Sequence, residues 1–395
     1  MHWCEIPVPA RRYILYHTII APMLITWYML PLYMFMTGYS VLEVGIVFTG
    51  VRITSIPLTY LIGKAFDRIP IRHGLAMIDA LSSIAYVLYG LSYGSIAPIL
   101  LFIGMLIEEL STILYPLYQA TEKILYPKDR LEEVFAWHMR LPELSQLIGF
   151  LVLGYVFGYV LTKPYHYRAF FIAIGLLSML MVVYILKALP KLDVEERLRI
   201  EKFTFKIDRE FTTILVIETL TTLAWSLTPE FVLLNYVINV LNLTLFEVMI
   251  VEAFISIGAI LATYITERIP KEYRYVAIAV GYIMVATWTL LMSMNPPFAV
   301  VVIAHFIARF GETLAFPFYR SWLFSKVPAH RASSLLAAVA SYRRLVATTA
   351  PAVAGYLANI HSTLPYTTAL ALYTATATLV MTKHLTTQLR KTNRK

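Results

Sequence analysis

Long stretches without a charged residue are the feature that most limits how this chain can fold. No Asp, Glu, Lys or Arg lies between Arg12 and Glu43, and none lies between Arg274 and Arg309. Each stretch exceeds the roughly 20 apolar residues that a helix needs to cross the hydrocarbon core of a bilayer. Charged residues make up 14% of the chain, whereas about 25% is typical of soluble domains. The sequence therefore predicts an integral membrane protein.

The membrane-spanning segments are expected to be α-helices. Inside lipid every backbone N–H and C=O must be paired within the protein, which leaves helices or a closed β-barrel, and the apolar runs lack the strict alternation of barrel strands. Turn residues and charges then divide the chain into twelve spans of an all-α membrane protein. The predicted spans are 13–38, 42–65, 74–93, 97–124, 133–161, 167–187, 210–236, 245–265, 274–294, 298–326, 331–359 and 364–384.

The distribution of Lys and Arg predicts the orientation of these spans. Six arginines lie inside spans, and all the other Lys and Arg except Lys163 and Arg168 lie in or beside the loops and tails of one face. Positive residues gather on the cytoplasmic side, so we expect both termini to be cytoplasmic in a protein of the plasma membrane. The net charge of +9 follows from basic loops that face anionic lipid headgroups, and no nucleic-acid partner is expected.

The second half of the chain repeats short motifs of the first at an offset of 200 to 204 residues. The repeated pairs are LEVGIV at 42–47 with FEVMIV at 246–251, FDRIP at 66–70 with TERIP at 266–270, and YPLY at 115–118 with FPFY at 316–319. We therefore predict two pseudo-symmetric six-helix bundles, at 1–188 and 210–395, joined by a charged cytoplasmic linker at 189–209. Because six is even, both bundles insert the same way up, related by an axis along the membrane normal.

The acidic residues of the FDRIP and TERIP motifs lie at the ends of their predicted helices. A carboxylate at a helix C-terminus is disfavoured by a few tenths to about 1 kcal/mol, and the residue before a proline leaves helical geometry, so Pro70 and Pro270 stop the two helices. We expect Asp67 and Glu267 to be compensated by the positive N-terminus of a helix from the other bundle. That contact would form in one arrangement of the bundles and break in another.

Together these features resemble the major facilitator superfamily of secondary transporters over essentially the whole chain. The family's loop motif is a glycine, three residues, then Asp-Arg-x-Gly-Arg-Arg/Lys, and it is matched here by Gly63, Asp67, Arg68 and Arg72. Pro70 replaces its second glycine, and Ile71 replaces an arginine. The resemblance implies alternating access, with a gate at these four residues and at Glu267 and Arg268 of the second copy. The alternative is that these charges only follow the positive-inside rule.

Charged and polar residues inside the spans are the candidates for substrate binding and coupling. A charge at a helix centre costs about 2.5–3.5 kcal/mol on insertion scales, so most of them must line a cavity or pair with one another. Helical spacing places polar stripes on spans 4, 7 and 10, and the resemblance implies that spans 1, 4, 7 and 10 line the central cavity. The predicted substrate and coupling residues are Glu108, Thr112, Tyr115, Glu218, Glu252, Arg309, Glu312, Arg344 and Arg52.

Two interpretations of these residues stay open. In one, arginines bind an anionic group of a small organic solute and glutamates carry protons; in the other, the opposite charges satisfy each other as ion pairs. Efflux of lipophilic compounds by the same fold is the alternative function, and a membrane-embedded enzyme or a non-transporting receptor is a more distant one. With the single cysteine Cys4 and no HExxH or phosphate-loop motif, we expect a monomer with no enzymatic activity, cofactor or metal, whose partners are solute, protons and lipid.

Overall fold

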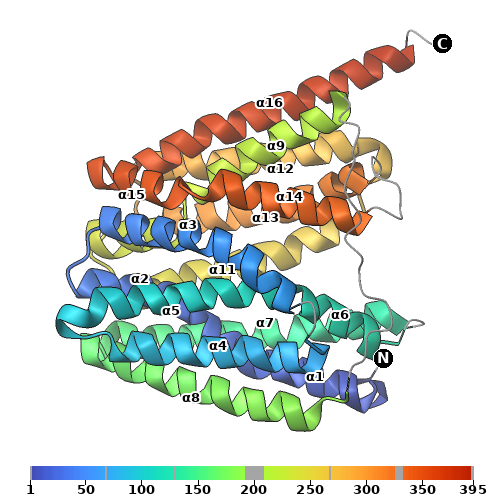
Figure 1. Ribbon diagram of the computed structural model, residues 1–395. Coiled ribbons are helices and arrows are strands. Elements are labelled where there is room, and N and C mark those ends of the chain that lie inside the picture. Colours follow the sequence, from blue (N-terminus) through green and yellow to red (C-terminus); the bar gives the residue numbers. More distant parts are fainter. Residues whose placement is uncertain are drawn as a thin grey trace. The chain divides into compact units, whose positions relative to one another are not determined.

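The structure, a computed structural model, describes residues 2–66, 69–127, 130–191, 209–266, 268–324 and 332–392 (Figure 1). Every regular element in these ranges is a helix. Ten of the helical segments are long and apolar enough to cross a membrane. Each of the twelve predicted spans coincides with a helix or with consecutive helices, which confirms the all-α membrane fold.

The helices of the N-terminal half come first along the chain. They are α1 (Val8–Ile20), α2 (Thr26–Met36), α3 (Val41–Phe66), α4 (Ile71–Leu91), α5 (Ala97–Ser111), α6 (Pro116–Leu125), α7 (Leu131–Tyr155) and α8 (Pro164–Ala188). The C-terminal half continues the series. It contains α9 (Arg209–Ser226), α10 (Glu230–Leu234), α11 (Leu245–Thr266), α12 (Arg274–Ser293), α13 (Phe298–Phe324), α14 (Ala332–Ala347), α15 (Ala350–Ile360) and α16 (Leu364–Thr392).

Proline lies at the break in four of the predicted spans. A tight 3-10 turn at Ala21–Ile25, with Pro22 as its second residue, separates α1 from α2. A similar turn at Thr112–Leu114 separates α5 from α6, which begins at Pro116, and α15 begins with Pro351 at its second position. Proline lacks an N–H and its ring clashes with the preceding turn, so the regular hydrogen-bond ladder stops there. In span 7, Pro229 directly precedes α10 and follows the end of α9. Spans 1, 4, 7 and 11 are therefore each built from more than one helix.

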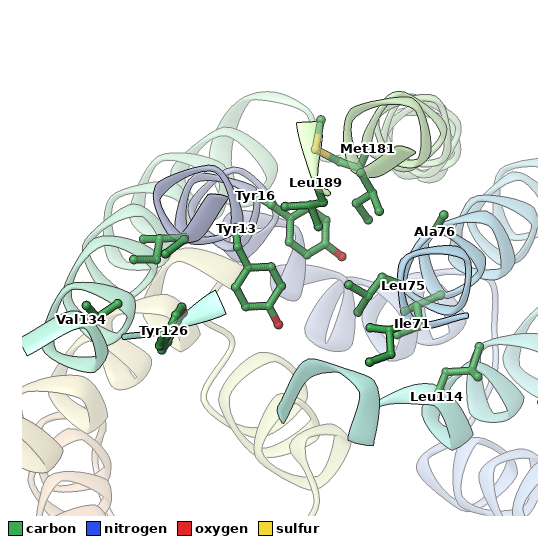
Figure 2. Close-up of a cluster of buried hydrophobic side chains, with 14 of the residues drawn as sticks. Tyr13, Tyr16, Ile71, Leu75, Ala76, Leu114, Tyr126, Val134, Met181 and Leu189 are labelled. Carbon is green, nitrogen blue, oxygen red and sulfur yellow. The ribbon is translucent and has the colours of Figure 1, made fainter. Parts of the chain in front are cut away.

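The chain divides into two compact units. The first comprises Met1–Tyr39 and Val47–Leu198, and the second comprises Ser40–Ile46 and Arg199–Lys395. In the first unit α4 lies between α5 and α8, and α1 packs against α7 (Figure 1). A cluster of buried side chains from α1, α4 and their neighbours forms its core near the N-terminus, and Figure 2 shows Tyr13 and Tyr16 side by side within it.

The second unit repeats the contacts of the first with its own helices. There α12 packs against α13 and α16, as α4 packs against α5 and α8, and α9 packs against α14 and α16. The core contains Phe211, Ile214, Tyr275 and Trp322. The start of α3 belongs to this unit because Gly45 lies directly against the backbone of Pro351 on α15.

Three of the predicted gating residues, Asp67, Arg68 and Glu267, lie outside the described residues, as does most of the predicted linker. The helices before them end where the motifs begin. Helix α3 ends at Phe66 and α11 ends at Thr266.

Candidate functional site

Glu108 lies inside the first unit and is hydrogen-bonded by tyrosines of a neighbouring helix. It is on α5, and its carboxylate accepts hydrogen bonds from the hydroxyls of Tyr89 at 2.6 Å and Tyr86 at 3.4 Å, both on α4. The Tyr86 hydroxyl also lies 3.3 Å from the hydroxyl of Thr26, which is the first residue after the break in span 1. No cation forms an ion pair with Glu108 in the described part of the chain. Its partners are neutral donors.

Asp79 is a second carboxylate held by tyrosines. It lies on α4 with 6% of its surface exposed, and it accepts a hydrogen bond of 2.8 Å from the hydroxyl of Tyr16 on α1. That hydroxyl lies 3.3 Å from the hydroxyl of Tyr118 on α6. Three helices of the first unit thus meet at one buried carboxylate, and within the described ranges no Lys or Arg pairs with it.

Two histidines and a glutamate continue this polar region toward the N-terminal end of the unit. The rings of His17 on α1 and His138 on α7 have centroids 4.7 Å apart. His138 Nδ1 lies 2.6 Å from the hydroxyl of Tyr126 and 3.6 Å from a carboxylate oxygen of Glu122 on α6. The Nε2 atom of His17 is buried and has no hydrogen-bond partner within the described residues.

The second unit holds its buried carboxylate differently, because an arginine takes part. Glu218 on α9 is 6% exposed and accepts a hydrogen bond of 2.9 Å from the hydroxyl of Tyr319 on α13. Its other oxygen lies 3.5 Å from Nε of Arg343 on α14. On α13 itself, Arg309 donates to Glu312 at 2.8 Å, and both side chains are about half exposed. Arg309 with Glu312 and Glu218 with Arg343 are thus ion pairs of the kind that the second interpretation describes.

The repeated motif YPLY/FPFY supplies matching tyrosines to the two units. Its last residue is Tyr118 in the first unit and Tyr319 in the second. Tyr118 contacts Tyr16, and Tyr319 contacts Glu218, and these two partners occupy matching places on spans 1 and 7. Each unit therefore joins a tyrosine of one proline-containing span to a polar residue of another. The carboxylates differ in position, since Asp79 lies on α4 and reaches Tyr118 only through Tyr16, whereas Glu218 on α9 bonds to Tyr319 directly.

Removing the Tyr319 hydroxyl should destabilise the second unit. A hydrogen bond to a charged group contributes about 1.5–3 kcal/mol, and both Tyr319 and Glu218 are buried. We expect Tyr319→Phe to lower the free energy of unfolding by that amount, measured by thermal denaturation in detergent. The matched control is Tyr342→Phe, which removes a bond between neutral hydroxyls, to Thr219, worth about 0.5–1.5 kcal/mol. Equal losses in the two variants would contradict the prediction.

The other predicted substrate and coupling residues are spread over both units. Thr112 opens the turn between α5 and α6, where its hydroxyl donates to the carbonyl of Glu109, and Tyr115 is 42% exposed beside Tyr118. The remaining three are Arg52, partly buried on α3, Glu252, partly buried on α11, and Arg344, exposed on α14. The structure thus brings Glu218 together with helices α13 and α14, and it places Glu108 in a separate tyrosine site.

The predicted gating residues that the structure describes lie near helix ends. Gly63 is within the last turns of α3. Arg72, in the first turn of α4, donates to the carbonyl of Leu189 at 3.4 Å, and Arg12 donates to Ala188 at 3.0 Å, so two arginines cap the C-terminus of α8. Cations at a helix C-terminus complement its negative dipole. Arg268 is exposed in the turn that follows α11.

Several members of these polar sites were not predicted from the sequence. They are Asp79, Tyr16, Tyr86, Tyr89 and Tyr319. Asp79 is the one aspartate that falls inside a predicted span. The free-energy cost of placing a carboxylate in the membrane could therefore have identified it as a candidate. The tyrosines gave no such signal, because Tyr is also expected at membrane interfaces.

The chain is similar to known membrane transporters in sequence pattern and in structure. The sequence model of the Major Facilitator Superfamily matches residues 13–351. A bacterial homologue of the iron transporter ferroportin in an inward-facing state has a similar structure, with a TM-score of 0.78, 14% identity, and coverage of 97% of this chain and 100% of that chain. No curated protein matches the sequence.

Two further solved structures share the same fold. A bacterial metal transporter aligns with a TM-score of 0.72 and 12% identity, covering 96% of this chain and 99% of that one. The nucleoside transporter NupG aligns with a TM-score of 0.63 and 16% identity, covering 94% of this chain and 97% of that one. At these identities the likeness establishes the fold alone.

Proposed function

Because the chain belongs to the major facilitator superfamily, we propose that it is a secondary active transporter that moves a small organic solute by alternating access and couples this movement to protons. The observation that supports coupling is the difference between the two units. In the first, the carboxylates of Asp79 and Glu108 have neutral tyrosine donors, whereas in the second Glu218 and Glu312 face arginines. A carboxylate without a cation gains a proton more readily when it leaves water.

The arginines of the second unit favour a solute with an acidic group. Arg343 is 55% exposed although it lies beside Glu218, and the Arg309 and Glu312 side chains are 43% and 41% exposed. Guanidinium groups that retain accessible N–H donors bind carboxylates and phosphates in bidentate geometry. Arg309 and Arg344 would then contact the solute, and the further members of the transport pathway would be Thr112, Tyr115, Arg52 and Glu252.

We further propose that the transporter acts as a monomer in the plasma membrane with both termini in the cytoplasm, an orientation that the distribution of Lys and Arg supports. The halves 1–188 and 210–395 rock about the solute, and the linker 189–209 joins them. Four charged residues close the cytoplasmic side in one of the two states. They are Asp67, Arg68 and their counterparts Glu267 and Arg268.

The test is a ligand screen followed by a flux measurement. Purified protein is screened by thermal shift with organic anions, zwitterions and lipophilic cations, because a ligand present at 100 times its Kd stabilises the folded state by about 2.7 kcal/mol. Stabilising compounds are then followed in proteoliposomes with and without a pH gradient. We expect organic anions among the stabilising compounds and flux that stops when an ionophore collapses the gradient. Stabilisation by lipophilic cations alone would favour multidrug-type efflux and overturn the proposal.

A further inference from the structure

A chain of polar side chains connects the most buried carboxylate of the first unit to its surface. Asp79 is 6% exposed, the His138 and Glu122 side chains are 13% and 19% exposed, and Arg130 beyond them is 36% exposed. Exposure is thus lowest at Asp79 and Tyr16 and higher at His138, Glu122 and Arg130. The helices that contribute these residues, α1, α4, α6 and α7, all belong to this unit.

We propose that Asp79 binds and releases a proton, and that this proton exchanges with water through neighbouring hydroxyl, imidazole and carboxylate groups. We refer to these groups as the proton route. Its members, from the inside outwards, are Asp79, Tyr16, Tyr118, His17, His138 and Glu122. The inference rests on the proposed coupling to protons and names the group and the path that would serve it.

The inner part of the proton route is hydrogen-bonded. The hydroxyl of Tyr16 donates to Oδ2 of the Asp79 carboxylate at 2.8 Å, and the Tyr16 and Tyr118 hydroxyls are 3.3 Å apart. In the protonated form Oδ2 carries the hydrogen and donates it to the Tyr16 oxygen. When Asp79 releases its proton, that hydrogen passes to the Tyr16 oxygen while the hydroxyl hydrogen of Tyr16 passes to Tyr118. The phenol is regenerated at each step, and Asp79 becomes a carboxylate that still accepts the bond from Tyr16.

The middle of the proton route is His17. Its ring lies 4.9 Å from the Tyr16 ring, 5.1 Å from the Tyr118 ring and 4.7 Å from the His138 ring, measured between centroids. Its buried Nε2 has no hydrogen-bond partner within the described residues. A buried nitrogen without a partner is costly, so Nε2 would gain from a hydrogen bond or a proton that reaches it. Rotation of the imidazole would present that nitrogen to either tyrosine or to His138.

The outer part of the proton route reaches water through His138 and Glu122. His138 Nδ1 lies 3.6 Å from a carboxylate oxygen of Glu122, and the hydroxyl of Tyr126 lies 2.6 Å from the same nitrogen. Beyond them Arg130 donates to Glu5 at 3.0 Å, and this hydrogen bond lowers the pKa of Glu5. These groups do not form a metal site, since no cluster of three or more His, Cys, Asp or Glu in the described residues could hold a metal ion.

The charged and titratable groups around Asp79 are consistent with a protonated state. Helix α1 contributes Tyr16, and the start of α6 contributes Tyr118 with Tyr115 just before it. Helix α5 carries Glu108 and Glu109, which interact electrostatically with Tyr115 as Asp79 does, while the stretch 169–183 of α8 has no ionisable side chain. Acidic and phenolic groups surround Asp79 without a neighbouring Lys or Arg ion pair within the described chain. Such surroundings favour the neutral carboxylic acid.

Infrared difference spectroscopy of the full-length protein in lipid tests the proposal without a solute. A protonated carboxyl in an apolar site gives a C=O band that disappears when pH is raised, and labelling with carbon-13 aspartate should shift this band in the unsubstituted protein. The chain has five aspartates, and Asp79 is the one inside a predicted span. Asp79→Asn should abolish the band, whereas the matched control Glu109→Gln should retain it. A band that is insensitive to aspartate labelling, or that persists in Asp79→Asn, overturns the proposal.

A kinetic measurement tests the proton route separately from the protonation of Asp79. After a rapid pH change the band should respond about tenfold more slowly in His17→Gln than in the unsubstituted protein, while its final amplitude stays the same. An unchanged rate in His17→Gln and in His138→Gln overturns the route. An Asp79 band that titrates in protein without any gradient-driven flux would refute the proposed function and leave this inference standing. Gradient-driven flux that persists in Asp79→Asn would overturn this inference and leave the proposed function standing.

Discussion

Replacement of Glu108 by glutamine is expected to reduce flux driven by a pH gradient by about 5- to 150-fold, the range that corresponds to coupling free energies of 1–3 kcal/mol. Gln keeps the size of the side chain, and its amide can accept a hydrogen bond from one of the two tyrosine hydroxyls that contact Glu108 and donate one to the other, but it cannot carry a proton. Exchange of labelled solute between two compartments at equal pH needs no net proton movement, so it should continue. The measurement compares these two modes in the same proteoliposomes.

Two further variants make the Glu108 prediction specific. Tyr89→Phe leaves the carboxylate in place and removes the shorter of its two hydrogen bonds, so it should alter the pH dependence of flux without abolishing it. Glu272→Gln, in the exposed turn before α12, serves as a control for the loss of one negative charge and should leave flux unchanged. Equal gradient-driven flux in Glu108→Gln and in the unsubstituted protein would exclude Glu108 as a coupling residue.

Substitution of Gly281 by leucine is expected to have the largest effect on folding. A Cβ atom added at Gly281 on α12 would overlap the carbonyl oxygen of Gly311 on α13, and one added at Gly311 would lie 2.6 Å from the carbonyl oxygen of Gly281. The obstacles are backbone atoms, which cannot rotate away as a side chain can. Small residues allow membrane helices to approach this closely, and the packing of the backbones provides much of the attraction.

The expected loss for Gly281→Leu is about 3 kcal/mol or more, at the upper end of what overpacking a well-packed core costs. The midpoint of thermal denaturation and the yield of monodisperse protein measure it. Val280→Leu is the matched control, because position 280 is adjacent and 39% exposed, and its midpoint should stay close to that of the unsubstituted protein. Since Gly311 lies between Arg309 and Glu312, flux should fall together with stability. A normal midpoint for Gly281→Leu would show that α12 and α13 are not packed as described.

The all-helical fold and the family could be predicted from the sequence because they depend on simple lengths and charges. The stretch between Arg12 and Glu43 is free of charged residues and long enough to cross a bilayer. In lipid such a stretch forms helix, because a helix pairs its own backbone N–H and C=O groups. The motif around Gly63 and Arg72 added the family resemblance, which the match over residues 13–351 confirms. The positions of most span boundaries followed from prolines and charges and lie within a few residues of the helices.

The polar sites were harder to predict because they depend on how helices are rotated against each other. Helical spacing placed Glu108, Thr112 and Tyr115 on one stripe, but the 3-10 turn at Thr112–Leu114 interrupts that helix. Glu108 instead faces tyrosines of α4. By contrast α13 is continuous, and the spacing of Arg309 and Glu312 gave a real contact. Periodicity thus predicted a direct contact within the regular helix α13, whereas the partners of Glu108 come from a neighbouring helix, which the spacing along one helix cannot show.

The interruptions in spans 1 and 4 have a mechanical consequence for the first unit. At Ala21–Ile25 and Thr112–Leu114 the regular ladder of backbone bonds is lost, and a helix bends most easily at such a point. Thr26 and Glu108 lie close to these two joints. A proton or solute that alters their contacts therefore acts at the points where spans 1 and 4 bend most easily. The two segments of a single span can then tilt separately while α4 and α8, which have no internal proline, keep their shape.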